Sequence, residues 1–501
     1  MSLPQSRPAQ ARPPAGAGAL ARAPAPPQAA HPLALWRTWV ALTGLAVVLC
    51  IWSTQWLGAG YCDNGDGWRV LRRILAEDVH APEPGIHTLA DTYRMTPLTA
   101  SNLDQALPRS TSGLLFSVVA LATRVAGSLD FHLPVITGLY FLSYLAGMAC
   151  WWRTSCPRGT RLLATLGWAT LLLQPYTLGL FHSLYEEAAL VALLPAWTWA
   201  LQRHWSSGTE RISFCLLSLS ILLAKPQAFV LLPLVLLTLW RHRSRQAGLA
   251  AGLMLLCVMA LGYRSQVQQA PFNAFNRLSY GVAISLEGVG HWPARDHLAR
   301  QAMANQKVDP TQVAHLGLPA GVLDSWGHGF WPYCSQASRP DCSVTEAAGR
   351  AGPFLRLLTT RPQLLGLTLR ESWWTAVHAD YSLNYITSHE GLAATPTSSA
   401  ILSRGGMVWW LTVVCLVMAA WRRNLLGLCL SAMTLATPTL TVLGDGYYEF
   451  ERHLLPFMAL TWPAALVLLP QSWPRSVANS PYRVEPAPGS QGQSDQRQRA
   501  A

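Results

Sequence analysis

The sequence predicts an all-α membrane protein, built as a bundle of about ten transmembrane helices with extracytoplasmic loops. Hydrophobic residues make up 51% of the 501 residues, only 12% are charged, and the mean hydropathy is +0.21. Apolar runs recur along the chain, and short arginine clusters separate many of them. This composition excludes a soluble globular protein, because such a protein of this length would carry more charge on its surface.

The basic residues are nearly all arginine, since Lys225 and Lys307 are the only lysines, and the formal net charge is +12. A nucleic-acid-binding protein gathers its basic residues on one polar face. Here they lie between apolar runs, which is how a membrane protein marks its cytoplasmic loops. We therefore exclude nucleic acid as a partner and expect the lipid bilayer to surround the chain.

The predicted spans are the apolar runs long enough to cross a bilayer, although several are short. They cover residues 35–57, 132–152, 162–181, 188–201, 212–224, 229–240, 248–263, 407–421, 425–443 and 454–469. Threaded from a cytoplasmic N-terminus, these spans place the arginine clusters in cytoplasmic loops, as the positive-inside rule requires. These clusters are Arg153/Arg158/Arg161, Arg203/Arg211, Arg241/Arg243/Arg245 and Arg422/Arg423. The sequence thus predicts a multi-pass protein of a bacterial inner membrane with both termini in the cytoplasm.

The same threading divides the chain into five parts. They are a disordered cytoplasmic tail (1–33), seven spans including an outer loop at 58–131 (34–263), an extracytoplasmic segment (264–404), three further spans (405–470) and a second disordered tail (471–501). Both tails are rich in residues that cannot form a packed core.

Two segments leave the count of spans open. Residues 112–126 are apolar enough to cross, but an eleventh span there would turn the later arginine clusters outward. We therefore interpret this segment as an amphipathic helix at the outer membrane surface. The spans 212–224 and 229–240 are short and are joined by Lys225-Pro226-Gln227, so broken or re-entrant helices are expected there.

Most of the ten cysteines lie inside apolar runs, where cysteine behaves as a small hydrophobic residue. Cys334 and Cys342 differ because they lie in the long extracytoplasmic segment, where a disulfide could persist. The sequence leaves open whether these two residues are bonded.

The first outer loop carries two acids, Asp63 and Asp66, followed by arginines that include Arg69. An aspartate here could take a proton from an acceptor hydroxyl or help to hold a divalent metal, and an arginine can bind phosphate. The alternative is that Asn64-Gly65-Asp66-Gly67 is a turn that caps a helix starting near Trp68. Whether a metal binds is left open.

Three further polar stretches fall on the same predicted side. Tyr185-Glu186-Glu187 either contributes to a polar site or favours the start of the next helix through its dipole. Lys225 lies at a bend next to proline, where it is either a snorkelling residue or a partner for an anionic phosphate. Glu449, Arg452 and His453 share one helical face, so an internal salt bridge competes with a role in a site.

Taken together, these stretches resemble a family of bacterial polytopic hexosyltransferases of glycan biosynthesis, which occur with S-layer and cell-surface polysaccharide genes. The likeness spans about residues 35 to 470 and lies in the order of the motifs. The matching motifs are Asn64-Gly65-Asp66 with Trp68-Arg69; Ser183, Tyr185 and Glu187; Lys225-Pro226-Gln227; Phe272-Asn273 with Tyr280-Gly281; and Gly444-Asp445-Gly446 with Glu449 and Arg452-His453-Leu454. The family itself is similar to the GT-C membrane glycosyltransferases.

The resemblance implies a GT-C-like bundle and an inverting transfer of a hexose from a polyprenyl-phosphate donor to a glycan or lipid-linked acceptor. It implies Asp66 as the first choice for the catalytic base and Asp63 as the second. The substrate-binding residues that it implies are Arg69, Tyr185, Glu187, Lys225, Asn273, Tyr280, Glu449, Arg452 and His453.

Two other function classes remain. A polysaccharide polymerase or ligase would use a lipid-pyrophosphate glycan as donor, and the sequence does not separate it from the transferase. A transporter of lipid-linked glycan would also need a polar cavity, but its site normally lies at the bilayer midplane between repeated halves. No internal repeat is visible in the sequence.

Overall fold

The computed structural model describes residues 32–57, 67–77, 92–102, 110–152, 157–203, 205, 207–241, 245–282, 334, 341–378, 405–446 and 450–469. Most of these residues are helical. The helices are α1 (Pro32–Leu57), α2 (Trp68–Arg73), α3 (Thr111–Val125), α4 (Leu133–Trp152), α5 (Arg158–Leu172), α6 (Pro175–Phe181), α7 (Glu187–Gln202), α8 (Gly208–Leu222), η1 (Pro226–Leu231), α9 (Leu232–Arg241), α10 (Arg245–Arg277), η2 (Leu278–Val282), α16 (Asp341–Gly349), α17 (Ala351–Thr360), α18 (Pro362–His378), α20 (Gly405–Trp421), α21 (Leu425–Asp445), α22 (Phe450–Met458) and α23 (Thr461–Leu466).

Three of the described helices are long and apolar enough to cross a membrane. The qualifying stretches are Trp36–Ser53 in α1, Leu133–Trp152 in α4 and Leu425–Gly444 in α21. Five shorter apolar helices accompany them: Thr111–Val125, Gln227–Arg241, Ala247–Ala260, Gly406–Trp421 and His453–Leu466. These helices are consistent with a membrane protein.

Each predicted span falls on a described helix, but three of the runs are interrupted. The run 162–181 divides between α5 and α6 because Pro175 follows Gln174, and a residue before proline avoids the helical region. The run 229–240 begins in the 3₁₀ turn of η1 and continues in α9. The run 454–469 divides between α22 and α23.

Large apolar side chains are exposed on the outward faces of several helices. They include Trp36, Val48 and Trp52 on α1, Leu256 on α10 and Trp410 on α20. Soluble proteins rarely expose apolar surface on this scale. These faces therefore suit a hydrocarbon environment.

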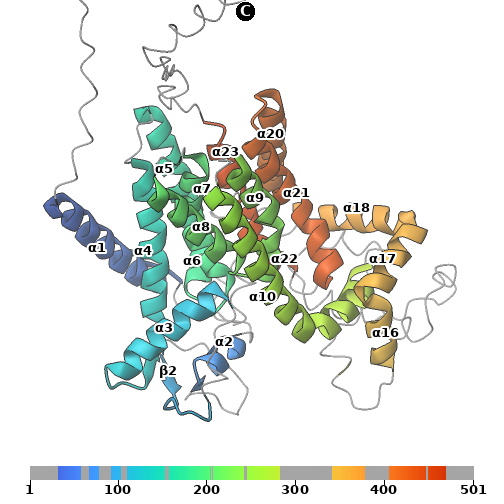
Figure 1. Ribbon diagram of the computed structural model, residues 1–501, viewed down its shortest axis with the longest axis horizontal. Helices are drawn as coiled ribbons and strands as arrows, with labels where there is room; N and C mark the ends of the chain where they lie inside the picture. The colour runs from blue at the N-terminus through green and yellow to red at the C-terminus, as the bar shows by residue number, and fades with distance from the viewer. Residues whose placement is uncertain are drawn as a thin grey trace, which may run out of the picture.

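Helices α4 and α7 pack closely together, with α1 beside α4 at one edge of the bundle and α16, α17 and α18 at the other edge (Figure 1). Gly147 of α4 permits the approach, because a Cβ built there would lie 2.6 Å from the backbone nitrogen of Ala196. Next to it, the indole of Trp151 donates a hydrogen bond of 3.0 Å to the carbonyl of Pro195. The opposite side of α7 is tied to α8, where Trp197 donates to Ser218 over 3.0 Å.

The structure corrects the all-α prediction in one place, since a small antiparallel sheet lies between α2 and α4. Its strands are β1 (Ala76–Glu77), β2 (Thr92–Met95) and β3 (Asp130–His132), in the order β1-β2-β3. Tyr93 pairs with Phe131, and both side chains are buried. The sheet thus connects the chain after α2 to the start of α4.

Residues 112–126, predicted as an amphipathic surface helix, correspond to α3. One face of α3 is buried through Ser112, Gly113, Phe116 and Ala120.

The described chain also contains the disulfide Cys334–Cys342, whose Cα atoms are 5.8 Å apart.

Candidate functional site

Three residues that the sequence predicted for the site meet at one point. The Nζ atom of Lys225 donates to Oε1 of Glu187 and lies 2.9 Å from Nδ1 of His453. Nδ1 of His453 lies 3.9 Å from the same carboxylate oxygen. The side chains are 15%, 3% and 5% exposed for Lys225, Glu187 and His453, so the charges interact away from water. We call these residues the Lys225 cluster.

Local structure explains how each member reaches the cluster. Glu187 lies in the first turn of α7, and His453 lies near the start of α22. Lys225 is the N-cap of η1 and has an extended backbone, with φ −156° and ψ 150°. Pro226 enforces that conformation, because its ring disfavours a helical residue before it.

The contact between Lys225 and His453 joins Nζ to Nδ1. A protonated lysine amine only donates hydrogen bonds, so beside an ammonium group Nδ1 of His453 is the acceptor. The ammonium group has three N–H donors, and the two contacts with Glu187 and His453 use two of them. The third can be donated to an oxygen of a bound anion.

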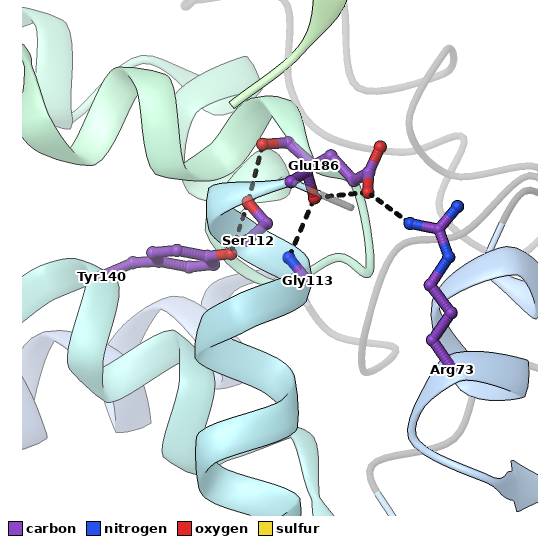
Figure 2. Close-up of polar contacts among 6 residues, drawn as sticks. Arg73, Ser112, Gly113, Tyr140 and Glu186 are labelled. Atoms are coloured by element: carbon purple, nitrogen blue, oxygen red, sulfur yellow. Dashed lines mark hydrogen bonds and ion pairs between the residues drawn. The ribbon is translucent and has the colours of Figure 1, made fainter. Parts of the chain in front are cut away.

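Glu186, the residue before Glu187, contacts a different set of side chains. Oε1 of Glu186 accepts a 2.5 Å hydrogen bond from Ser110 and lies 3.4 Å from Nη1 of Arg73 in α2 (Figure 2). Glu186 is the N-cap of α7, but its side chain makes no capping hydrogen bond to that helix. The two adjacent acids therefore serve two different sets of partners.

The start of α3 adds further contacts at this point. Ser112 donates to the carbonyl of Glu186 over 2.7 Å and accepts from the hydroxyl of Tyr140 over 3.2 Å (Figure 2). Thr111 donates from Oγ1 to the carbonyl of Ser220 over 2.5 Å and from its backbone nitrogen to the carbonyl of Leu223 over 3.0 Å. Helix α3 is thereby attached to both α7 and α8.

Two other predicted motifs lie against each other. A Cβ built on Gly281 in η2 would lie 3.1 Å from the Cα atom of Gly446, and 3.0 Å from the carbonyl oxygen of Val442 in α21. Gly446 has a positive φ of 70°, which favours glycine. Tyr280-Gly281 and Gly444-Asp445-Gly446 are therefore neighbours in space.

The remaining predicted residues are distributed as follows. The side chain of Tyr185 is buried, and its backbone nitrogen donates to Oγ of Ser183 over 3.2 Å. Asn273 lies in α10, and its carbonyl accepts from Arg277 over 3.2 Å. Arg69 lies in α2, Tyr280 in η2 and Arg452 in α22. Asp63, Asp66 and Glu449 lie outside the described residues.

The helix predicted to start near Trp68 is present as α2, whose N-cap is Gly67. Within the described part of the chain, no group of three or more histidine, cysteine, aspartate or glutamate side chains is placed to hold a metal ion. In the Lys225 cluster, the cation beside Glu187 and His453 is the lysine amine.

The sequence did not single out Ser110, Thr111 or Ser112 as part of the site. The Ser-Thr-Ser run before an apolar segment predicts only a helix N-cap, and Ser110 does cap α3 by accepting from the backbone nitrogen of Gly113 over 3.0 Å. Their contacts with α7 and α8 depend on tertiary packing.

Comparison with known proteins identifies no relative, since no family model, curated protein or solved structure matches the chain.

Proposed function

We propose that this protein is a membrane glycosyltransferase that moves a hexose from a polyprenyl-phosphate donor to a cell-surface glycan or a lipid-linked acceptor. The observation that carries the proposal is the Lys225 cluster, in which Lys225, Glu187 and His453 meet from three separate segments. Each of these residues belongs to a motif of the family that the sequence resembles.

The reaction needs a cation where the donor's phosphate leaves. In the proposed transfer, a base takes the proton of an acceptor hydroxyl, and that oxygen bonds to the anomeric carbon of the hexose. The bond from that carbon to the phosphate oxygen breaks, and polyprenyl phosphate leaves with the electron pair. A positive charge already fixed in a site with little water stabilises this developing anion.

Lys225 suits this role because its position does not depend on the ligand. Glu187 and His453 orient the amine, and its third N–H can be donated to a phosphate oxygen. Glu187 also lowers the net charge of the cluster, which favours release of the phosphate after transfer. Arg69 and Arg452 are proposed as further phosphate ligands, and Asp66 as the base.

The proposed membrane arrangement follows the arginine clusters. About ten helices cross a bacterial inner membrane, both termini lie in the cytoplasm, and the Lys225 cluster faces the extracytoplasmic side. Labelling of a cysteine placed in the 241–245 loop tests this arrangement, and labelling from outside intact cells would contradict it.

The decisive experiment is a transfer assay. Purified protein in detergent is mixed with a panel of polyprenyl-phosphate hexoses and candidate acceptors, and released polyprenyl phosphate is measured by mass spectrometry. We expect release by the wild type and a loss of about 10²–10³-fold in turnover for Lys225→Met, which is typical for removal of one stabilising donor.

The matched control is Glu210→Gln on α8, which removes an ion pair with Arg203, the C-cap of α7, outside the cluster. This variant should turn over at the wild-type rate. Release of a lipid pyrophosphate from lipid-pyrophosphate glycans alone would identify a polymerase or ligase instead. Movement of intact lipid-linked glycan across proteoliposomes without any release would identify a transporter.

A further inference from the structure

Three consecutive hydroxyl residues at the start of α3 contact the two helix ends that carry the charged pair Lys225 and Glu187. Ser110 and Ser112 bond to the side chain and the carbonyl of Glu186, respectively, immediately before Glu187. Thr111 bonds to the carbonyls of Ser220 and Leu223. Leu223 is the C-cap of α8, two residues before Lys225.

The positions of these contacts matter because Lys225 and Glu187 belong to separate helices. Glu187 is carried by the start of α7, whereas Lys225 follows the end of α8. A relative shift of about 1 Å between binding groups can cost about 100-fold in rate. One segment that contacts both helix ends can fix the position of the Lys225 amine relative to the Glu187 carboxylate.

The contacts are partly buried, and further residues support them. Ser112 is fully buried, and Tyr140 of α4 donates to its hydroxyl oxygen. Glu186 is held on its other side by Arg73 of α2. The start of α3 is thus fixed to α2, α4, α7 and α8.

We infer that Ser110, Thr111 and Ser112 act together with Glu186 as positioning residues for the Lys225 cluster. We call these four residues the α3 clamp. The clamp acts on substrate only through Lys225 and Glu187, so its effect on binding of the donor's phosphate rests on the proposed function. Its effect on the geometry of the ion pair is independent of the proposed function.

The two lysines of the chain permit a direct test of that geometry. Lys225 and Lys307 lie in different peptides, so mass spectrometry can follow the reaction of each amine with an amine-selective acylating reagent. A buried amine held by Glu187 and His453 should react slowly in the wild type. The purified full-length protein in detergent is used without any substrate.

Thr111→Val and Ser112→Ala remove one clamp hydroxyl each. We expect the paired variant Thr111→Val/Ser112→Ala to raise the rate of Lys225 acylation by about tenfold, which corresponds to about 1.4 kcal/mol. Lys307 should react at its wild-type rate. Thr111→Ser keeps the hydroxyl, so the single variant Thr111→Ser should label at the wild-type rate.

The matched control is Thr123→Val on the same helix, because the hydroxyl of Thr123 bonds within α3, to the carbonyl of Val119. This variant should label at the wild-type rate. Glu187→Gln sets the upper reference, since it removes the charge that holds the amine. The single variant Thr111→Val, which removes only the bond to the carbonyl of Ser220, replaces the double variant if that protein elutes as an aggregate in size-exclusion chromatography.

Wild-type labelling of Lys225 in the clamp variants overturns the inference, and so does wild-type labelling in Glu187→Gln, because the ion pair is its premise. Where transfer is measurable, the clamp variants should lower kcat more than they raise the KM for the polyprenyl-phosphate hexose, because Lys225 is proposed to stabilise the leaving phosphate in the transition state. Absence of transfer by the wild type would overturn the proposed function and leave the labelling result valid.

Discussion

Lys225 and Glu187 form a partly buried ion pair between the start of η1 and the first turn of α7, two segments that are 38 residues apart in the sequence. The carboxylate of Glu187 is only 3% exposed. Removal of two charges from water is costly, and it is tolerated when each charge finds its partner. The energy of the pair is therefore tied to the packing of α7 against α8.

Removal of Lys225 alone should destabilise the protein strongly. Lys225→Met removes the amine that is paired with the carboxylate of Glu187, and loss of one partner of such a pair typically costs about 3–5 kcal/mol. The double variant Lys225→Met/Glu187→Gln should recover most of this loss, because neither charge remains. Denaturant unfolding in detergent measures both. Arg203→Gln, which breaks an ion pair near the surface, is the control and should cost under about 1 kcal/mol.

His453 should tolerate a replacement that keeps its acceptor. The Oδ1 atom of asparagine occupies a position similar to Nδ1 of histidine, so His453→Asn can still accept from Lys225. His453→Leu cannot, and it should cost about 1.5–3 kcal/mol, as expected for a lost hydrogen bond to a charged group. Thermal unfolding compares the two variants. An equal loss of stability in His453→Asn and His453→Leu would show that the hydrogen bond accepted by His453 does not contribute to stability.

Gly147 should be sensitive to a single added methyl group. In Gly147→Ala the Cβ would lie 2.6 Å from the backbone nitrogen of Ala196 and 2.9 Å from Cβ of Pro195, so α4 and α7 must move apart. Overpacking of this kind costs about 1–3 kcal/mol. Gly138→Ala on the same helix is the control, because no atom lies within 4 Å of the Cβ built there. It should be neutral in the same unfolding assay.

Asp66→Asn should abolish transfer while the protein stays folded and still binds the lipid donor. Loss of a general base lowers rates by about 10²–10⁴-fold. Asp63→Asn should be damaging to a smaller degree. Asparagine has nearly the size of aspartate and can still cap a helix, so Asp66→Asn distinguishes a role as catalytic base from a role as helix cap. Near-wild-type turnover by Asp66→Asn would leave the turn-and-cap interpretation of this loop in place.

The disulfide provides a prediction about compartment. Cys334 and Cys342 should resist alkylation in unfolded, unreduced protein and should react after reduction, because they are bonded. Mass spectrometry of protein taken from the native membrane gives the result. Alkylation of both residues before reduction would place this segment in a reducing compartment, against the proposed topology.

Hydropathy located the helices well, because an apolar run of sufficient length leaves few alternatives to a helix in or near a membrane. It missed the break between α5 and α6, since an average over residues 162–181 does not register Pro175 as a helix start. It also missed the sheet, whose strands of two to four residues are too short for a periodic signal.

The site was predictable only in part. The order of motifs pointed to Glu187, Lys225 and His453, but no local pattern places Lys225 beside a residue 228 positions later. Glu186 shows the same limit, because Glu186 and Glu187 are both acidic and both lie at the start of α7. Only the packing of α3 against α7 and α8 separates the roles of these two acids.

The shortness of α7 and α8 has a consequence for the surrounding lipid. With 16 and 15 residues, these helices are about 22–24 Å long, whereas the hydrocarbon core of a typical bilayer is about 30 Å thick. Helix α7 is almost entirely buried in the protein, whereas α8 exposes Ile212 and Leu216. On the proposed membrane arrangement, this hydrophobic mismatch would be relieved by local thinning of the bilayer beside α8. Headgroups would then be drawn inward beside the cluster at the end of α8. A lipid-borne phosphate could reach Lys225 while its polyprenyl tail stayed in hydrocarbon.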